Sequence, residues 1–245
     1  MAKNTLLIDG DIVAFQASAS LEHPTKYDED TWILWASESD TKAKFNDMMS
    51  TLLDKSGCAD VVVAFSDKVN FRKELDANYK ANRAKTRKPM LLPLLRDYCQ
   101  SRYRTLIYPR IEADDVLGLC GTYEPLFEEC VIYSIDKDLM QIPGRHLIDD
   151  EIVEVTPEQA DYFFLKQILT GDQADNYPGC KGIGEKRATA ILDEDPTWEA
   201  VVKAYEKAGL SEEDAIHQAQ LARILRYGEY DLESQTVNLW RPNGR

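Results

Sequence analysis

Thr5-Leu6-Leu7-Ile8-Asp9-Gly10-Asp11 is the stretch that decides the fold. Four strand-like residues end in two acids, a pattern typical of a buried parallel strand that delivers polar side chains at its carboxyl end. Apolar runs at residues 61–65, 105–108 and 131–135 repeat the pattern, and each is followed by acids. We therefore predict an α/β fold whose mostly parallel central sheet is flanked by helices and carries these acids on one rim.

Helical spacing of apolar residues predicts the connections between these strands. Helices are expected over residues 12–20, 31–55 and 90–103, and another from Glu112. Within the second of these, Trp32 and Trp35 recur with the other apolar residues and are expected in the core. Residues 145–155 are expected to form two short edge strands around Asp149-Asp150.

The composition changes at Thr156, where strands give way to helices, so we place a domain boundary there. Residues 1–155 are predicted to form the α/β domain and residues 156–245 a helical region. Within the second part the expected helices are 157–169, 185–192, 198–208 and 211–226, and Trp198 and Trp240 are expected in the core. A tail strand at 237–240 is predicted to return to the first domain.

The segment Ile111-Glu112-Ala113-Asp114-Asp115-Val116-Leu117-Gly118 crowds three carboxylates beside apolar residues, which calls for a cation. Acids at strand ends and in acidic loops complete a set of ten: Asp9, Asp11, Asp67, Glu112, Asp114, Asp115, Asp136, Asp138, Asp172 and Asp175. Oxygen ligands without His or Cys select hard ions, and two such ions suit displacement at a phosphodiester. For any single acid a turn or helix-cap role is as good a reading, above all for Asp11.

The net charge of −14 argues at first against a nucleic-acid partner, but its distribution matters more. Residues 68–88 hold eight basic and two acidic side chains, which makes a basic patch. The five cysteines form no C-x-x-C pair and no apolar run is long enough to span a membrane. A cytoplasmic protein without a membrane partner is expected.

Two elements of the sequence are suited to phosphate. On a helix Lys80 and Arg83 would point toward one place, where the arginine can grip a phosphate and the lysine can offset developing negative charge. Gly182-Ile183-Gly184 offers bare backbone N–H groups before a helix, with cations beside it at Lys181, Lys186 and Arg187. A solvated basic face is the alternative for Lys85, Arg87 and Lys88, and an ordinary turn is the alternative for the glycines.

Five segments together resemble, in order and spacing, the 5′-nuclease superfamily of flap endonucleases and polymerase-associated 5′-exonucleases. They are Ile8-Asp9-Gly10-Asp11, Tyr79-Lys80-Ala81-Asn82-Arg83, Glu112-Ala113-Asp114-Asp115, Ile135-Asp136-Lys137-Asp138, and Gly171 to Asn176 followed by Gly182 to Ala188. The tail and the Asn70 to Leu75 segment look closer still to the 5′→3′ exonucleases of short-tailed lytic phages. The resemblance implies a PIN-like sheet, an arch at about 70–104 and a helix–turn–helix hairpin at about 165–192. The arch of this chain is shorter than the arch of most flap endonucleases.

The resemblance also implies roles for individual residues. It places the first metal on Asp9, Asp67, Glu112 and Asp114, and the second on Asp114, Asp136, Asp138 and Asp175, with Asp115 and Asp172 acting through waters. Lys80, Arg83, Asp114 and Asp136 would be catalytic. DNA would be contacted by Arg72, Tyr79, Lys80, Arg83, Lys181, Gly182, Gly184, Lys186 and Arg187. The hairpin often carries K⁺ on its loop carbonyls.

The sequence thus predicts a monomeric Mg²⁺- or Mn²⁺-dependent 5′→3′ exonuclease that acts on duplex DNA with a free 5′ end. Phage DNA replication and RNA primer removal are the expected setting, in the host cytoplasm. A flap endonuclease or an RNA–DNA hybrid nuclease on the same scaffold is the nearest alternative. The alternative from another class is a non-catalytic DNA-binding accessory protein, whose mark would be missing strand-end acids.

Overall fold

A six-stranded sheet forms the centre of the computed structural model, which describes residues 4–123 and 130–242. The strand order is β5-β4-β1-β6-β7-β8, and every neighbouring pair is parallel except β7 with β8. The strands are β1 (Thr5–Asp9), β4 (Asp60–Ala64), β5 (Arg104–Leu106), β6 (Val131–Tyr133), β7 (Gly144–Ile148) and β8 (Glu151–Val155). The mostly parallel sheet is confirmed. Only β8 of the last two strands is an edge, because β7 pairs with β6.

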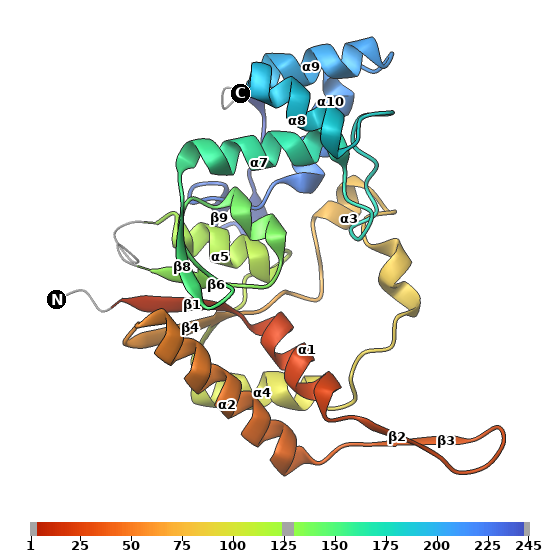
Figure 1. Cartoon of the computed structure of the whole chain (residues 1–245), viewed down its shortest axis with the longest axis vertical. Coiled ribbons are helices and arrows are strands. Elements are labelled where there is room, and N and C mark those ends of the chain that lie inside the picture. The colour runs from red at the N-terminus through yellow and green to blue at the C-terminus, as the bar shows by residue number, and fades with distance from the viewer. Residues whose placement is uncertain (1–3, 124–129, 243–245) are drawn as a thin grey trace.

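Helices cover both faces of the sheet (Figure 1). Leu6 and Ile8 of β1 face a core shared with helices α1 (Gly10–Ser20), α2 (Glu38–Ser56) and α4 (Leu92–Arg102). Leu7 faces the opposite core, which contains α5 (Ala113–Gly121). This alternation follows from the two-residue period of a strand, and burial on both faces explains why β1 is apolar from Leu6 to Ile8.

The helical region follows β8 and lies above α5 in Figure 1. Its helices are α7 (Pro157–Thr170), α8 (Glu185–Glu194), α9 (Trp198–Lys207) and α10 (Glu212–Ala222). Capping boxes at Thr156 and Ser211 start α7 and α10 by satisfying backbone N–H groups that have no partner in the helix. The expected helix to residue 226 is too long, because the backbone turns to an extended conformation at Arg223. From there the chain returns toward α5.

The prediction of one helix over residues 31–55 is wrong in its first part. Residues 23–35 form an antiparallel hairpin of β2 (His23–Lys26) and β3 (Trp32–Trp35), which projects from the body in Figure 1. The Asp28 carboxylate accepts hydrogen bonds from the N–H groups of Asp30 and Thr31 and so closes the turn. Trp32 and Trp35 are 63% and 51% exposed, so neither belongs to the core.

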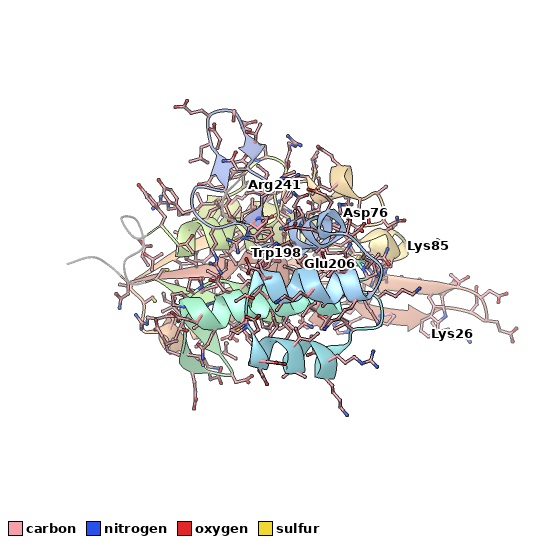
Figure 2. All side chains as sticks on the ribbon, turned by 90° about the horizontal axis from the view of Figure 1, so that it is seen from above. Lys26, Asp76, Lys85, Trp198, Glu206 and Arg241 are labelled. Carbon is pink, nitrogen blue, oxygen red and sulfur yellow. The ribbon has the colours of Figure 1, made fainter. Side chains whose placement is uncertain are left out.

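The C-terminal tail forms a separate small hairpin of β9 (Tyr230–Asp231) and β10 (Thr236–Val237). The tail strand predicted at residues 237–240 is therefore shorter and pairs with β9, but its return to the first domain is confirmed, because Tyr230 and Val237 pack against the core around α5. Trp240 instead packs on Phe164 and Trp198 of the helical region, with ring centroids 5.2 Å and 5.0 Å away. Figure 2 shows Trp198 on this helical layer and Lys26 on the projecting β2–β3 hairpin. In the two ranges that the structure describes, no helix is long and apolar enough to cross a membrane.

Candidate metal centre and nucleic-acid interface

Three acids come together at the carboxyl ends of the neighbouring strands β4, β1 and β6. Asp9 ends β1, Asp67 follows β4 and Asp136 follows β6. With Glu112 and Asp114 at the start of α5, these side chains line one cleft of about 580 Å³. The expected convergence on one rim is confirmed for these five residues.

Asp9 is deeply buried and is also the N-cap of α1. Its carboxylate accepts hydrogen bonds from the Ile12 N–H and the Ser134 hydroxyl, both at 3.2 Å. Burial, followed by the charge of Asp11, raises the pKa of Asp9 to about 7. The N-cap that the sequence suggested for Asp11 thus belongs to Asp9. Asp11 instead accepts from the Ser66 N–H and from Arg96.

The protein does not supply enough hydrogen-bond donors and positive charge to stabilise ionised carboxylates at Asp114 and Asp138. Each has a buried Oδ1 that accepts no hydrogen bond from the described residues. Burial raises the pKa of Asp114 well above its ordinary value, and the charges of Asp9 and Asp136 raise it further. Burial, then Asp136 and Asp172, raise the pKa of Asp138 to about 7. A buried acceptor without a donor is costly, so an external cation or donor is the expected partner.

Glu112 is held by three donors. Lys80 Nζ lies 2.6 Å from its Oε1, and the Tyr79 hydroxyl donates to its Oε2 at 3.0 Å. Arg72 donates more weakly to the same Oε2, at 3.4 Å. Although burial alone would raise it, Lys80 and then Arg72 lower the pKa of Glu112 to about 2. Glu112 is therefore an anion at any physiological pH.

The donor set fits a hard divalent cation. Glu112, Asp114, Asp138 and Asp175 border a small internal cavity of about 20 Å³, room for about one water-sized particle. Oxygen donors alone suit Mg²⁺ or Mn²⁺, and the two unpartnered oxygens are the atoms such an ion would satisfy. Among the described residues no three acids, histidines or cysteines converge closely enough to enclose an ion as they stand. Lys80 lies among these carboxylates and supplies the positive charge.

Lys80 and Arg83 at the base of the arch point toward one place, as the sequence predicted, although Lys80 is not on a helix, and in the free protein that place holds the Asp175 carboxylate. Lys80 precedes the 3₁₀ helix η1 (Ala81–Lys85) in a left-handed conformation, with φ at 53°. Asp175 lies 2.6 Å from Arg83 and 3.4 Å from Lys80. Although burial lowers the pKa of Lys80, Glu112 and Asp175 raise it above its ordinary value, so the side chain stays an ammonium. Arg83 is half exposed at 51% and borders the cleft.

Asp172 belongs to a tight turn next to this group. Its Oδ1 accepts hydrogen bonds from the N–H groups of Ala174 and Asp175, at 2.6 Å and 3.1 Å. This turn fixes the position of the Asp175 carboxylate beside Lys80 and Arg83. Asp172 also lines a second cleft of about 510 Å³ with Asp136 and Asp138.

Two expected DNA contacts are corrected by their burial. Arg72 is 3% exposed and its guanidinium binds Asp115, at 2.7 Å from each carboxylate oxygen. Tyr79 is also 3% exposed, and its hydroxyl donates to Glu112 and Asp175. In the free protein carboxylates hold both side chains, so neither presents its polar group to solvent for a phosphate.

Asp115 is corrected for the same reason. It is fully buried, and its two oxygens accept hydrogen bonds from Arg72 and from the N–H groups of Glu112 and Leu225. An acid whose lone pairs are used in this way has no oxygen left for a water on a metal. Asp115 points to the C-terminal segment and not to the cleft.

Sequence reasoning missed several residues that hold the rim in place. The Ser134 hydroxyl donates to Asp9 and accepts from the Asp136 N–H, and so links two strand ends. The Ser66 hydroxyl accepts the Ala113 N–H at the start of α5. The serines one residue before Asp67 and two residues before Asp136 are a signal that could have found both. Arg96, which follows the apolar first turn of α4, was a signal for the partner of Asp11.

The glycine loop presents its cations to solvent. Gly182 has a φ of 79°, which favours glycine, and Gly184 is the N-cap of α8. Lys181, Lys186 and Arg187 are exposed, and within the described chain none of them forms an ion pair. The second cleft runs from Asp136 and Arg83 to Gly184. Since Asp136 and Arg83 line both clefts, the glycine loop adjoins the carboxylate rim.

The wall of the first cleft carries further free cations. Lys68, Lys73 and Lys88 line it, and none has an acidic partner among the residues that the structure describes. Arg87, by contrast, is paired with Glu22 at 2.5 Å. In a chain with 43 acids and 29 bases, cations that the fold leaves unpaired indicate an external anion.

A family model described as "5'-3' exonuclease, N-terminal resolvase-like domain" matches residues 4–166. A curated "Exonuclease" of Escherichia phage T7 is 31% identical, with 98% of this chain and 94% of that protein covered. An "Exodeoxyribonuclease" of Enterobacteria phage T3 is 29% identical over 98% of this chain and 93% of its own length.

The fold also has a solved counterpart. A structure of the bacteriophage T5 D15 flap endonuclease, described as a complex with DNA and metal ions, superposes with a TM-score of 0.68. It covers 90% of this chain and 89% of the T5 chain at 17% sequence identity, which supports the fold alone. From the family model and the two phage relatives, this chain belongs to the 5′-3′ exonuclease family and is a hydrolase of the nuclease class.

Proposed function

We propose that this chain is a divalent-metal-dependent 5′→3′ exodeoxyribonuclease that hydrolyses phosphodiester bonds at the 5′ end of duplex DNA. The observation that carries the proposal is that Asp114 and Asp138 each have a buried oxygen without a hydrogen-bond partner among the described residues, on a rim faced by Lys80 and Arg83. Surplus negative charge next to these two positive side chains suits a site that admits cations together with a phosphate.

The residues that would hold two Mg²⁺ or Mn²⁺ ions follow from the rim. Asp9, Asp67, Glu112 and Asp114 would hold one, and Asp114, Asp136, Asp138 and Asp175 the other. Asp172 would act through water. When bound, such ions activate a water nucleophile and stabilise the leaving oxygen. Asp67 contributes an ionised carboxylate, because the Arg110 N–H lowers its pKa.

Lys80 and Arg83 have two alternative sets of partners under this proposal. They bind Glu112 and Asp175 in the free protein. Once cations neutralise these acids, both side chains are free to bind the scissile phosphate. In the free protein Lys80 is charged because the acids around it raise its pKa. The phosphate would replace these acids as the anionic partner of Lys80, which could then offset negative charge that develops on the phosphate.

The duplex would leave the rim along the second cleft toward Gly184. The positive end of α8 and the nearby cations Lys181, Lys186 and Arg187 suit backbone phosphates without reading sequence. A K⁺ ion on the loop carbonyls remains a prediction. Arg187 donates to the Gly182 carbonyl at 2.8 Å, so this oxygen already has one cationic partner.

A second candidate is a structure-specific flap endonuclease, which the fold likeness to the T5 flap endonuclease favours. The relatives in phages T7 and T3, named as an exonuclease and an exodeoxyribonuclease, favour the exonuclease. A place in phage DNA replication, including primer removal, remains a prediction. A non-catalytic accessory protein is disfavoured because the strand-end acids are all present. We expect the chain to act as a monomer.

Digestion of three end-labelled substrates with Mg²⁺ tests the proposal. A blunt duplex, a duplex with a 5′ flap and an RNA–DNA hybrid carry the same sequence and a label at either end. The exonuclease predicts mononucleotides or short oligonucleotides from the 5′ end of the blunt duplex. Cleavage confined to the flap junction would favour the endonuclease, and no cleavage with Mg²⁺ or Mn²⁺ would reject an enzyme.

A further inference from the structure

Arg72 has more hydrogen-bond partners than a surface cation needs. Each of its five N–H groups has an acceptor: Leu221 O, Glu112 Oε2, the two oxygens of Asp115, and Arg223 O. The planar guanidinium offers five donors and no acceptor, so this environment satisfies it completely. Such a match cannot be made by any other side chain.

Asp115 is matched to the same degree from the other side. Besides Arg72 it accepts from the Glu112 N–H at 3.0 Å and from the Leu225 N–H at 3.1 Å. The first bond fixes the backbone of Glu112 at the start of α5, and the second fixes the chain after α10. The Arg72–Asp115 pair therefore ties together the arch base, the carboxylate helix and the C-terminal segment.

The location of Arg72 makes this connection useful. It lies in α3 (Arg72–Leu75), which contacts α10 and stands between the sheet and the helical region in Figure 1. Leu75 of the same helix packs against both the core around α5 and the core of the helical region. A shift of the helical region relative to the sheet would have to break these buried contacts.

We propose that Arg72 is a positioning residue: through Asp115 and Glu112 it sets the place of the Glu112 carboxylate at the rim and couples it to the C-terminal segment. This inference rests on the proposed function. Arg72 donates a hydrogen bond to Glu112 Oε2, and the Glu112 side chain also lines the cleft. Residues 221–225, remote in sequence, thereby become part of the support of the site.

Arg72→Lys is the informative variant because it keeps the positive charge but loses the planar guanidinium with its five N–H donors. We expect kcat on duplex DNA to fall about 10- to 100-fold, the usual effect of removing a group that orients a metal ligand. The DNA KM should change by less than about threefold, because Arg72 touches no substrate. The affinity for Mn²⁺ without DNA, followed by electron paramagnetic resonance, should weaken by a similar factor of about ten or more.

Arg226→Lys is the matched control. The guanidinium of Arg226 pairs with Asp161 at 2.8 Å and donates to the Gln141 carbonyl at 2.7 Å, and neither partner belongs to α5 or to the contacts of Arg72. It should lose stability in the same way while kcat and Mn²⁺ affinity stay within about twofold of the original. All rates are taken well below the unfolding temperature of each variant, so that a loss of stability alone does not lower them.

The double variant Arg72→Lys, Asp115→Asn separates two roles for Asp115. If both residues act through one pair, the double variant should lose no more activity than the more damaged single variant. Additive losses would mean that Asp115 acts on a metal by itself, and would overturn the inference. If Arg72→Lys does not fold, Asp115→Asn alone must weaken Mn²⁺ binding, and unchanged binding in that variant would also overturn it.

The failure of this inference differs from failure of the proposed function. An original protein that leaves DNA uncut with Mg²⁺ would reject the function. An active original protein whose Arg72→Lys variant keeps its kcat and Mn²⁺ affinity would reject only the positioning role. A salt dependence of DNA binding that falls by about one unit in Arg72→Gln, which removes the charge, would instead make Arg72 a phosphate contact.

Discussion

The carboxylate rim and the glycine loop hold charge in different ways. At the rim, Asp9, Asp114 and Asp138 are buried with raised pKa values, and Asp114 and Asp138 each have an oxygen that accepts no hydrogen bond from a described residue. At the loop, Lys181 and Lys186 are exposed and free of ion pairs in the described ranges. The rim is built for ions in a fixed geometry, and the loop for a partner held at its surface. The two regions should therefore affect different kinetic constants.

The largest expected effect is on the rim. Asp114→Ala or Asp136→Ala should lower kcat by about 1000-fold or more, since a lost metal ion removes several kcal/mol of transition-state stabilisation. DNA binding measured in Ca²⁺ or without metal should be retained. Single-turnover digestion of a 5′-labelled duplex measures the rate. Substantial activity in the double variant would contradict the assignment of these acids.

Lys80→Met should give the next largest effect. Removing an ammonium aimed at developing negative charge typically lowers kcat about 100-fold or more. The DNA KM should change much less, because Arg83 and the loop cations remain. Lys44→Met is the control, since Lys44 is exposed on α2 and has no acidic partner in the part of the chain described. An unchanged kcat would remove Lys80 from the mechanism.

The loop should respond in binding. Lys181→Gln with Lys186→Gln should lower the slope of log binding constant against log salt by about 0.9 for each phosphate that the loop no longer neutralises. At saturating DNA, kcat should stay the same. The paired control Lys26→Gln with Lys44→Gln removes equal charge from the β2–β3 hairpin and α2. If both pairs change the slope equally, the glycine loop has no special part in binding.

The smallest effect concerns pH and stability. A carboxyl group whose pKa is higher in the folded than in the unfolded state stabilises the folded protein while it is protonated. Because Asp9 and Asp138 are such groups, the metal-free protein should lose stability as the pH rises from about 3.8 to about 7. A cation that binds the ionised acids offsets this loss only above that window. Mg²⁺ should therefore raise Tm more at pH 8 than at pH 5.5 in scanning calorimetry. A larger shift at pH 5.5 would have the wrong sign.

The sequence was sufficient for the parts of the molecule with a local signature. The strand-end acids Asp9, Asp67 and Asp136 could be predicted to lie together, because parallel strands have their carboxyl ends on one rim of the sheet. The N-cap and proline pair Thr156-Pro157 and the capping-box pattern that begins at Ser211 likewise marked two helix starts. In these places neighbours in the chain are also the residues that decide the structure.

Long-range contacts decided the rest. Arg72 and Tyr79 lie in a basic segment and look like DNA contacts, yet their partners Asp115 and Glu112 are about 40 residues away and Leu221 is 149 away. Trp32 and Trp35 fit helical spacing, but the turn at Asp28 pairs them with β2 instead. The local sequence pattern around a residue does not determine whether its side chain is exposed.

The strand-end acids should bind two hard cations at one rim. Diffraction from crystals soaked in Mn²⁺, recorded at the manganese absorption edge, locates such ions. We predict two anomalous peaks, one bounded by Asp9, Asp67, Glu112 and Asp114 and the other next to Asp136, Asp138 and Asp175. Crystals whose peaks all lie elsewhere, or that show none at millimolar Mn²⁺, would contradict it.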